Sequence, residues 1–234
     1  MITDIKSEIK KLANPKKAKT LQRFFKTGKG EYGEGDIFLG LTVPQSRSIS
    51  TIYYAQITFF DIEDLLKSKI HEERLIALQM LRLKFEKLAG VQEKIYQFYL
   101  NHTKYINNWD LIDGTADVII GGFLFGKDTK ILKKLAQSQS VWEKRIAMIA
   151  TYYFLKNGQS EETQKIAKIL LQDKHDLIQK AVGWMLREMG KRCSRKILGD
   201  FLKEHYKTMP RTALRYAIEH FPEEKRKAYL KGIV

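Results

Sequence analysis

Apolar positions recur along this chain with the spacing of amphipathic helices, and similar helical segments recur with an internal period of about 35 residues. In the segment that begins at Val141, for example, Ile146, Ile149 and Ala150 share one predicted helical face with Tyr153. The similar segments are HEERLIALQML from His71, NNWDLIDGTADVI from Asn107, VWEKRIAMIATYYF from Val141, KHDLIQKAVGWML from Lys174 and MPRTALRYAIEHF from Met209.

Each of these segments is joined to the next by a second helical stretch, such as EETQKIAKILLQ, so the repeating unit is a helical pair. No pair holds enough apolar surface to fold alone, and neighbouring pairs must therefore stack. The pattern predicts an all-α fold, an α-solenoid of HEAT-like repeats with a concave surface. A basic helical pair is expected over residues 2–26, then a glycine-rich loop, and repeats from about Pro44 onward. Since no long linker interrupts this pattern, we expect residues 1–234 to form a single repeat domain.

Charge indicates what the concave surface binds. The chain holds 42 Lys and Arg against 27 Asp and Glu, a formal net charge of +15, and the basic excess grows toward the C-terminus. A polyanion is the natural partner of such a groove, although a basic surface kept for solubility would have the same composition. The longest apolar run, Val118 to Phe125, is too short to span a bilayer, and the N-terminus shows no signal-like segment. We expect a cytoplasmic protein without a membrane partner.

The cysteine and histidine residues show no spacing typical of a metal or cofactor site. One cysteine, Cys193, can form no internal disulfide and belongs to no C-x-x-C pair, which fits a reducing compartment. The five histidines lack metal-type spacing and are expected at the surface or at helix ends: His71, His102, His175, His205 and His220. We predict no metal and no cofactor.

The glycine-rich loop satisfies a literal G-x-G-x-x-G through Gly28, Gly30 and Gly33. This match is weak, because a helix-like segment precedes it where a dinucleotide site needs a strand, and nearby acidic residues would repel a pyrophosphate. We interpret the loop as a connection that allows close backbone approach.

Four side chains, Trp109, Asp113, Arg145 and Trp184, fall on one helical face when the repeats are aligned, over an arc of roughly 140° at about 100° per residue. Taken singly, each tryptophan could be core packing, and Asp113 with Arg145 could be a structural ion pair. Taken together, two aromatic faces with a carboxylate and a guanidinium between them suit the binding of a cation.

The segments around these residues resemble the AlkD family of DNA alkylation repair glycosylases. The resemblance is carried by N-N-W-D-L-I-D at Trp109, V-W-E-K-R-I-A at Arg145, Q-K-A-V-G-W-M-L-R-E at Trp184, F-L-G from Phe38 to Gly40 and M-P-R-T-A-L-R-Y-A near the end. It implies HEAT-like repeats wrapped around duplex DNA and excision of N3- and N7-alkylated purines such as 3-methyladenine and 7-methylguanine, as in base excision repair. The family's functional residues match Trp109, Asp113, Arg145 and Trp184. This sequence departs from the family at Phe24, where a tyrosine is expected, and at Thr42, where a longer polar side chain is expected.

The chemistry agrees with these residue types. An alkylated purine is already cationic and leaves as a neutral base, so the reaction needs a stabilised oxocarbenium and no general acid. We expect Asp113 to supply that negative charge, the two indoles to contact the cationic nucleotide, and Arg145 to bridge to a backbone phosphate.

Phosphate contacts that do not read base sequence are expected from the basic side chains Lys26, Lys29, Arg47, Lys180, Arg187, Arg211 and Arg215. A shallow groove offers no obvious pocket for a flipped base, so we expect the lesion to stay near the duplex. Two alternatives remain, namely a catalytically silent binder of damaged or branched DNA and a protein-scaffolding solenoid. No obligate protein partner is indicated.

Overall fold

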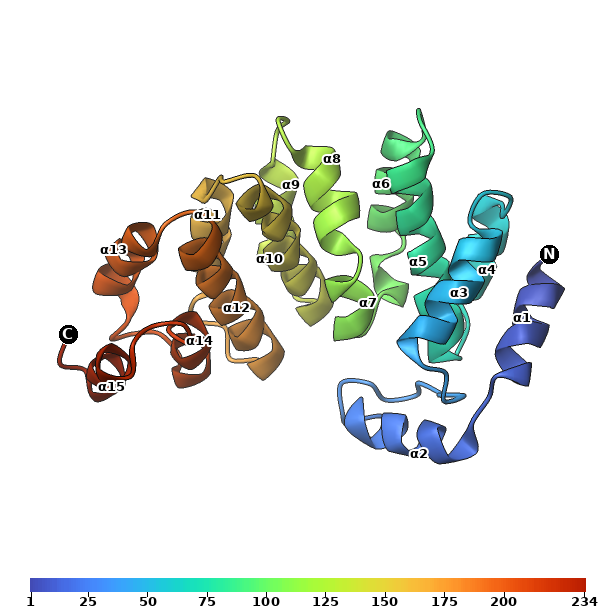
Figure 1. Ribbon diagram of the computed structural model, residues 1–234, viewed down its shortest axis with the longest axis horizontal. Helices are drawn as coiled ribbons and strands as arrows, with labels where there is room; N and C mark the ends of the chain where they lie inside the picture. The colour runs from blue at the N-terminus through green and yellow to red at the C-terminus, as the bar shows by residue number, and fades with distance from the viewer. The chain divides into compact units, whose positions relative to one another are not determined.

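The computed structural model describes residues 1–234, and it confirms the all-α prediction (Figure 1). Its one extended pairing is an isolated bridge between Ile37 and Ile70. The chain divides into two compact units, Met1–Thr115 (unit 1) and Ala116–Val234 (unit 2). None of the helices combines the length and the apolar character that a bilayer span requires.

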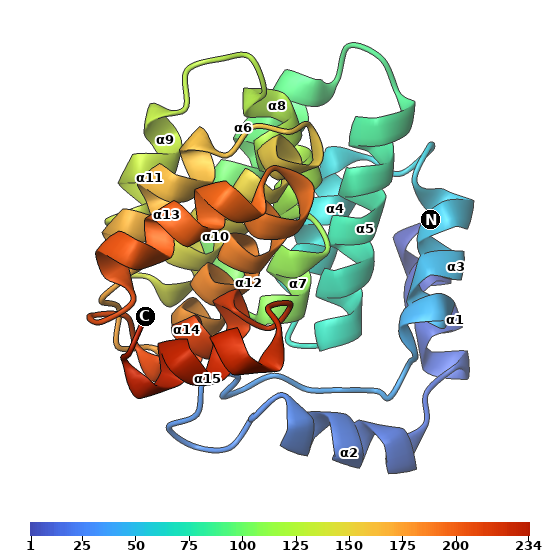
Figure 2. The ribbon, with the colours of Figure 1, turned by 60° about the vertical axis from the view of Figure 1, so that its left-hand side comes forward.

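Unit 1 begins with the predicted N-terminal pair and continues into the first repeats. Its elements are α1 Ile2–Lys11, α2 Pro15–Phe24, α3 Val43–Tyr53, α4 Phe59–Leu66, α5 His71–Lys87, α6 Gln92–Asn101, the 3₁₀ turn η1 Thr103–Tyr105 and α7 Trp109–Asp113. The long helix α5 is central, because α1, α3, α4, α6 and α7 all contact it. By contrast, α2 runs crosswise to α1, α3 and α5 (Figure 2).

Unit 2 contains the helices of the later repeats. Its elements are the π-helix η2 Asp117–Gly121, α8 Gly122–Leu124, α9 Lys130–Ala136, α10 Val141–Lys156, α11 Glu161–Leu170, α12 Asp176–Arg192, α13 Arg195–His205, α14 Arg211–Ala217 and α15 Glu223–Lys231. Two layers result, since η2, α10, α12 and α14 pack in succession while α9, α11 and α13 cover them. The predicted pairing of helices is therefore confirmed, and Ile146, Ile149 and Ala150 are buried as expected.

One predicted helix is interrupted. The segment from Asn107 forms the short helix α7, a turn at Gly114 and Thr115, and then the π-helix η2. Thr115 Oγ1 donates to the carbonyl oxygen of Leu111 at 2.6 Å, and such back-bonding bends helices. Glycine before it also lowers helix propensity. The division between the two units falls at this turn.

Glycines bring η2 into backbone contact with α10, and α12 into backbone contact with α14. A Cβ on Gly121 would lie 2.1 Å from the carbonyl oxygen of Ala150 in α10. A Cβ on Gly183 in α12 would likewise lie 2.4 Å from the carbonyl oxygen of Ala213 in α14. Both positions therefore require glycine, because the facing atoms belong to backbone that cannot move aside.

Replacing Gly183 by alanine should lower the free energy of unfolding by about 1–3 kcal/mol, since the added methyl overpacks the contact of α12 with α14. Gly199→Ala is the matched control, because Gly199 lies inside α13 with no atom within 4 Å of its Cβ position. This control should raise the free energy by about 0.5–1 kcal/mol through helix propensity. Urea unfolding measures both changes, and an equal loss in the two variants would contradict the close contact.

Candidate active site

The predicted pair Trp109 and Asp113 occupies the first and last residues of α7, so the two side chains are i and i+4 neighbours. Asn108 precedes them at 0% exposure, and its Oδ1 accepts a hydrogen bond from the Trp109 N–H at 2.8 Å. A helix of five residues is too short to be stable by its own hydrogen bonds. The orientation of Trp109 and Asp113 is therefore set by the side chains that surround α7.

Trp109 packs on aromatic side chains from the end of α2 and the loop after it. Its ring stacks on Phe25, with centroids 5.0 Å apart and planes at 15°, and Phe24 meets it edge-on at 5.9 Å. Phe25 stacks in turn on Phe38 at 4.9 Å. Phe25 and Phe38 are buried, whereas Trp109 is half-buried and Phe24 is 62% exposed. Core packing thus accounts for part of the indole and leaves the rest accessible.

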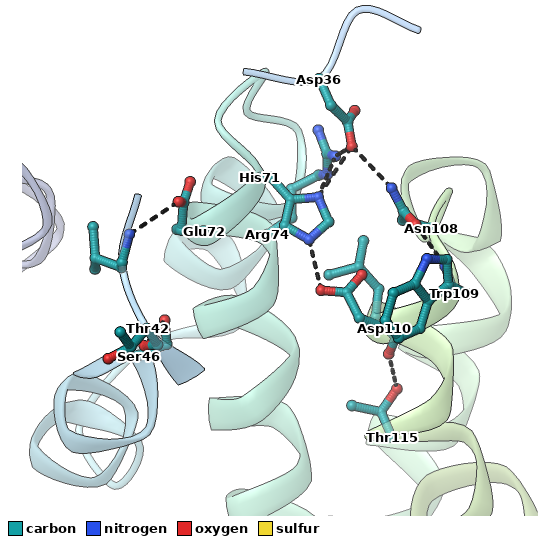
Figure 3. A network of polar contacts seen from close by, with 12 residues as sticks. Asp36, Thr42, Ser46, His71, Glu72, Arg74, Asn108, Trp109, Asp110 and Thr115 are labelled. Atoms are coloured by element: carbon teal, nitrogen blue, oxygen red, sulfur yellow. Dashed lines mark hydrogen bonds and ion pairs between the residues drawn. The ribbon is translucent and has the colours of Figure 1, made fainter. Parts of the chain in front are cut away.

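A buried polar network ties α7 to α5 and to the loop before α3 (Figure 3). His71, the first residue of α5, is 1% exposed, and its Nδ1 lies 3.0 Å from Asp36 Oδ2 while its Nε2 lies 2.8 Å from Asp110 Oδ2. The same Asp36 oxygen accepts from Arg74 Nη2 at 2.6 Å and from Asn108 Nδ2 at 3.5 Å. Because ionised carboxylates only accept hydrogen bonds, this geometry suits an imidazolium that donates from both ring nitrogens, while Arg74 Nη2 also lies 3.4 Å from Nδ1.

The surroundings of His71 stabilise this charge. Burial by itself lowers the pKa of His71, but the Asp110 and Asp36 carboxylates outweigh it and hold the pKa above the usual value. Burial by itself likewise raises the pKa of Asp36, yet hydrogen bonds from His71 and Arg74 bring it below the usual value. The second oxygen of Asp110 is buried without a partner, so the Asp110 carboxylate depends on His71 alone.

The sequence did not reveal this network. His71 does lie at a helix end, as predicted, but it is buried in a polar cluster. The clue in the sequence is the position of His71 at the start of a helix. The N-terminus of a helix disfavours a positive charge, so a protonated histidine there needs carboxylates close by. Which carboxylates supply them follows only from the fold, since Asp36 and Asp110 are 35 and 39 residues away.

The glycine-rich loop is occupied by its own acidic residues. Glu31 accepts from the Gly28 N–H at 2.9 Å, and Glu34 accepts from the Gly30 N–H at 2.8 Å. These backbone donors are therefore unavailable to a pyrophosphate. A Cβ on Gly33 would lie 2.5 Å from a backbone carbonyl oxygen at the end of α2, which confirms the predicted close approach.

The F-L-G segment is held by a carboxylate from α5. Glu72, which is buried, accepts from the backbone N–H groups of Leu39, Gly40 and Leu41 at 2.8–3.2 Å. Gly40 has φ +91°, and a Cβ there would lie 2.2 Å from the carbonyl oxygen of Asn14. Only glycine fits this position, which explains one residue of the segment that carries the family resemblance.

Both departures from the family have a structural account. Phe24 has no hydroxyl, and its exposed ring extends the aromatic surface beside Trp109. Thr42 precedes α3, and its Oγ1 and backbone N–H each lie 2.8 Å from Gln45 Oε1. The Thr42 hydroxyl therefore contributes to the cap at the N-terminus of α3.

Arg145 and Trp184 lie in unit 2 on the neighbouring helices α10 and α12. Arg145 is 5% exposed, and its Nη1 donates to the carbonyl oxygen of Leu177 near the start of α12 at 2.6 Å. Trp184 is half-buried, with its ring 6.1 Å from that of Tyr152. Since Trp109 and Asp113 belong to unit 1, the convergence of all four side chains on one spot stays a prediction.

The basic residues predicted in unit 1 are accessible. Lys26, Lys29 and Arg47 are exposed. Arg47 also lines a cavity of about 360 Å³ together with residues of α3 and α5 and with Asp110 and Thr115. A recess thus exists in unit 1, whereas the sequence predicts a shallow surface.

The basic residues predicted in unit 2 differ in their availability. Arg215 is exposed and forms no ion pair. The other three hold intramolecular partners: Lys180 pairs with Asp176, Arg187 with Glu219, and Arg211 with the Leu230 carbonyl oxygen. A phosphate would have to compete with those partners.

The comparisons with known proteins that give a match concern DNA alkylation repair enzymes. The family described as DNA alkylation repair enzyme matches residues 5–221 of this chain. No curated protein gives a significant match. Among solved structures, the chain is similar to one described as a predicted DNA alkylation repair enzyme from Enterococcus faecalis, with 16% identity and a TM-score of 0.70 over 90% of this chain and 97% of the other. At this identity the likeness shows a shared fold.

The stability that the His71 bridge adds should depend on pH. Because its pKa is raised in the folded protein, the contribution is complete below the unfolded value of 6.5 and is lost as the pH rises through the folded value. Asp110→Asn should therefore reduce the free energy of unfolding most at about pH 5.5, and less as the pH rises. Urea unfolding between about pH 5 and pH 9 tests this, with Asp200→Asn in the exposed Lys196 pair as a flat control. If the difference in free energy of unfolding between the parent and Asp110→Asn grows with pH, the prediction is wrong.

Proposed function

Because the chain belongs to the DNA alkylation repair enzyme family, we propose that it is a DNA N-glycosylase. It hydrolyses the N-glycosidic bond of cationic N3- and N7-alkylated purines in duplex DNA, without a metal or a cofactor. The observation that carries this proposal is α7, which presents a half-buried indole and a carboxylate one turn apart.

The substrate's own charge determines what the protein has to do. Alkylation at N3 or N7 makes the purine cationic, so it departs as a neutral base and no general acid is needed. Positive charge moves to the deoxyribose as the bond breaks. A carboxylate held near that sugar stabilises the transition state more than the ground state, which is the condition for catalysis.

Asp113 and Trp109 are the residues of unit 1 that suit this task. We assign to Asp113 the stabilisation of the oxocarbenium and the orientation of the attacking water. The accessible part of the Trp109 indole contacts the cationic nucleotide, a cation–π interaction that is worth about 0.5–2 kcal/mol when water is excluded. Phe25 stacks on the same ring and keeps it in one orientation.

Trp184 and Arg145 are the residues of unit 2 that suit the same reaction. Trp184 provides a second indole for the nucleotide. Arg145 is buried, which leaves little guanidinium surface for a phosphate, and its hydrogen bond to Leu177 ties α10 to the helix that carries Trp184. We therefore assign Arg145 a positioning role ahead of the phosphate contact expected from the sequence.

Asp113→Asn should slow purine release from a duplex that contains 7-methylguanine by about 100- to 1000-fold, since removal of one preorganised electrostatic group has effects of that size. The measurement is the single-turnover rate of free purine release at equal DNA occupancy. Asp128→Asn, which changes an exposed aspartate outside α7, is the control and should match the parent.

The outcomes separate the alternatives. Release by the parent that is retained in Asp113→Asn would remove the assigned role of Asp113. No release by any of the proteins, with tight binding of the duplex, would instead identify a catalytically silent binder of damaged or branched DNA.

Binding of duplex DNA should weaken steeply with salt. If all seven predicted basic residues contact phosphates, the slope of log K against log salt concentration is about −6. Arg215→Ala should make this slope shallower by about 1, because Arg215 is exposed and unpaired. Lys165→Ala, which removes a lysine of α11 that is already paired with Glu162, is the control and should leave the slope unchanged. Absence of measurable duplex binding in this titration would instead favour a protein-scaffolding solenoid.

A further inference from the structure

The short helix α7 is anchored at its N-terminal end by two side chains. Asn108 reaches Asp36, and Asp110 reaches His71. Of these two contacts, the one between Asp110 and His71 is shorter, 2.8 Å against 3.5 Å, and joins opposite charges. Asp110 lies between Trp109 and Asp113 on the same five-residue helix, so any change in its position changes theirs.

We propose that His71 is a positioning residue for purine excision, because its imidazolium bridges Asp36 and Asp110 and thereby sets the orientation of Trp109 and Asp113. This inference rests on the proposed glycosylase function. His71 touches neither DNA nor the reacting atoms, and acts through α7.

The chemistry of imidazole explains why the bridge requires a proton. A neutral ring donates from one nitrogen only, so it can serve one of the two carboxylates. Asp36 keeps Arg74 and Asn108 when His71 loses its proton, whereas Asp110 has no other partner. Whichever nitrogen keeps the remaining proton, the deprotonated ring no longer donates to both carboxylates, so His71 no longer joins the loop that carries Asp36 to α7.

The aromatic rings transmit the same constraint by a second route. The His71 ring stacks on Phe38 with centroids 4.4 Å apart, and lies 5.2 Å from Phe25. Phe25 then stacks on Trp109. A cation over an aromatic face is favourable, so the protonated ring also stabilises the stack that supports the indole.

Three charged groups face His71, from three different segments of unit 1. They are Asp36 from the loop after α2, Arg74 from α5 itself, and Asp110 from α7. From the end of α2 the neighbour is the uncharged ring of Phe25. Two carboxylates against one guanidinium favour the protonated ring, and removal of the Asp110 charge reverses part of that balance.

The test is the pH profile of single-turnover release of 7-methylguanine for the parent and for Asp110→Asn, at saturating protein. Asp110→Asn should reduce the rate at about pH 8 by about 10- to 100-fold, since a shift of about 1 Å at a reacting group has effects of that size. Its alkaline limb should lie at lower pH than that of the parent. DNA affinity should stay within about threefold of the parent, because the change acts on the bound complex.

Asp117→Asn is the matched control. Asp117, like Asp110, has one cationic partner, Lys156 at 2.8 Å, and one buried oxygen without a partner, but it lies outside α7. Its pH profile should keep the position of the parent's alkaline limb. An Asp110→Asn profile that coincides with the parent's would overturn the positioning role while leaving the glycosylase proposal intact.

A second measurement keeps the inference independent of activity and of the folding of any variant. In the parent protein, the indole N–H resonance of Trp109 should shift with the same midpoint as the His71 ring resonances during an NMR pH titration. A Trp109 indole chemical shift that does not change as His71 titrates would overturn the inference. If the parent releases no purine, the glycosylase proposal fails, and this titration alone decides whether His71 sets the position of α7.

Discussion

Stacking between successive helical pairs is the interaction on which the rest of this structure depends. A pair of helices has too little apolar surface to fold alone, so each repeat is stable only against its neighbours. In unit 2 the contact extends to the backbone, because Gly121 and Gly183 admit carbonyl oxygens of the next helix. One consequence is that a side chain of one helix meets the backbone of the next at a defined place, as Arg145 does at the Leu177 carbonyl oxygen.

The start of α5 and the loop that packs on it hold a cluster of buried charged residues. Asp36, His71, Glu72 and Arg74 are all buried there, and each has a partner of complementary charge or a set of backbone donors. Breaking such a group by removing one member leaves an uncompensated buried charge, which costs about 3–5 kcal/mol. Because of this cost, the network favours one arrangement of the loop, α5 and α7. Trp109 and Asp113 are presented in that arrangement.

Three aspartates follow one another closely around α7 in a strongly basic protein, and we propose different tasks for them. Asp110 and Asp117 have cationic partners within their own units, His71 and Lys156, and are part of the scaffold. Asp113 is the carboxylate that we assign to catalysis. The assignment agrees with the chemistry of a cationic lesion, for which a positioned negative charge does most of the work and a proton donor does none.

Local patterns in the sequence determined the helices, their pairing and the adjacency of Trp109 and Asp113, because amphipathic periodicity and i, i+4 spacing depend only on nearby residues. They also predicted the close backbone approach in the glycine-rich loop. Tertiary structure alone decided that Arg145 is buried and that His71 bridges Asp36 and Asp110. These outcomes depend on groups brought together from more than 30 residues apart, or on how deeply a side chain is enclosed by its neighbours. Local periodicity carries no information about either, because both are properties of the packed helices.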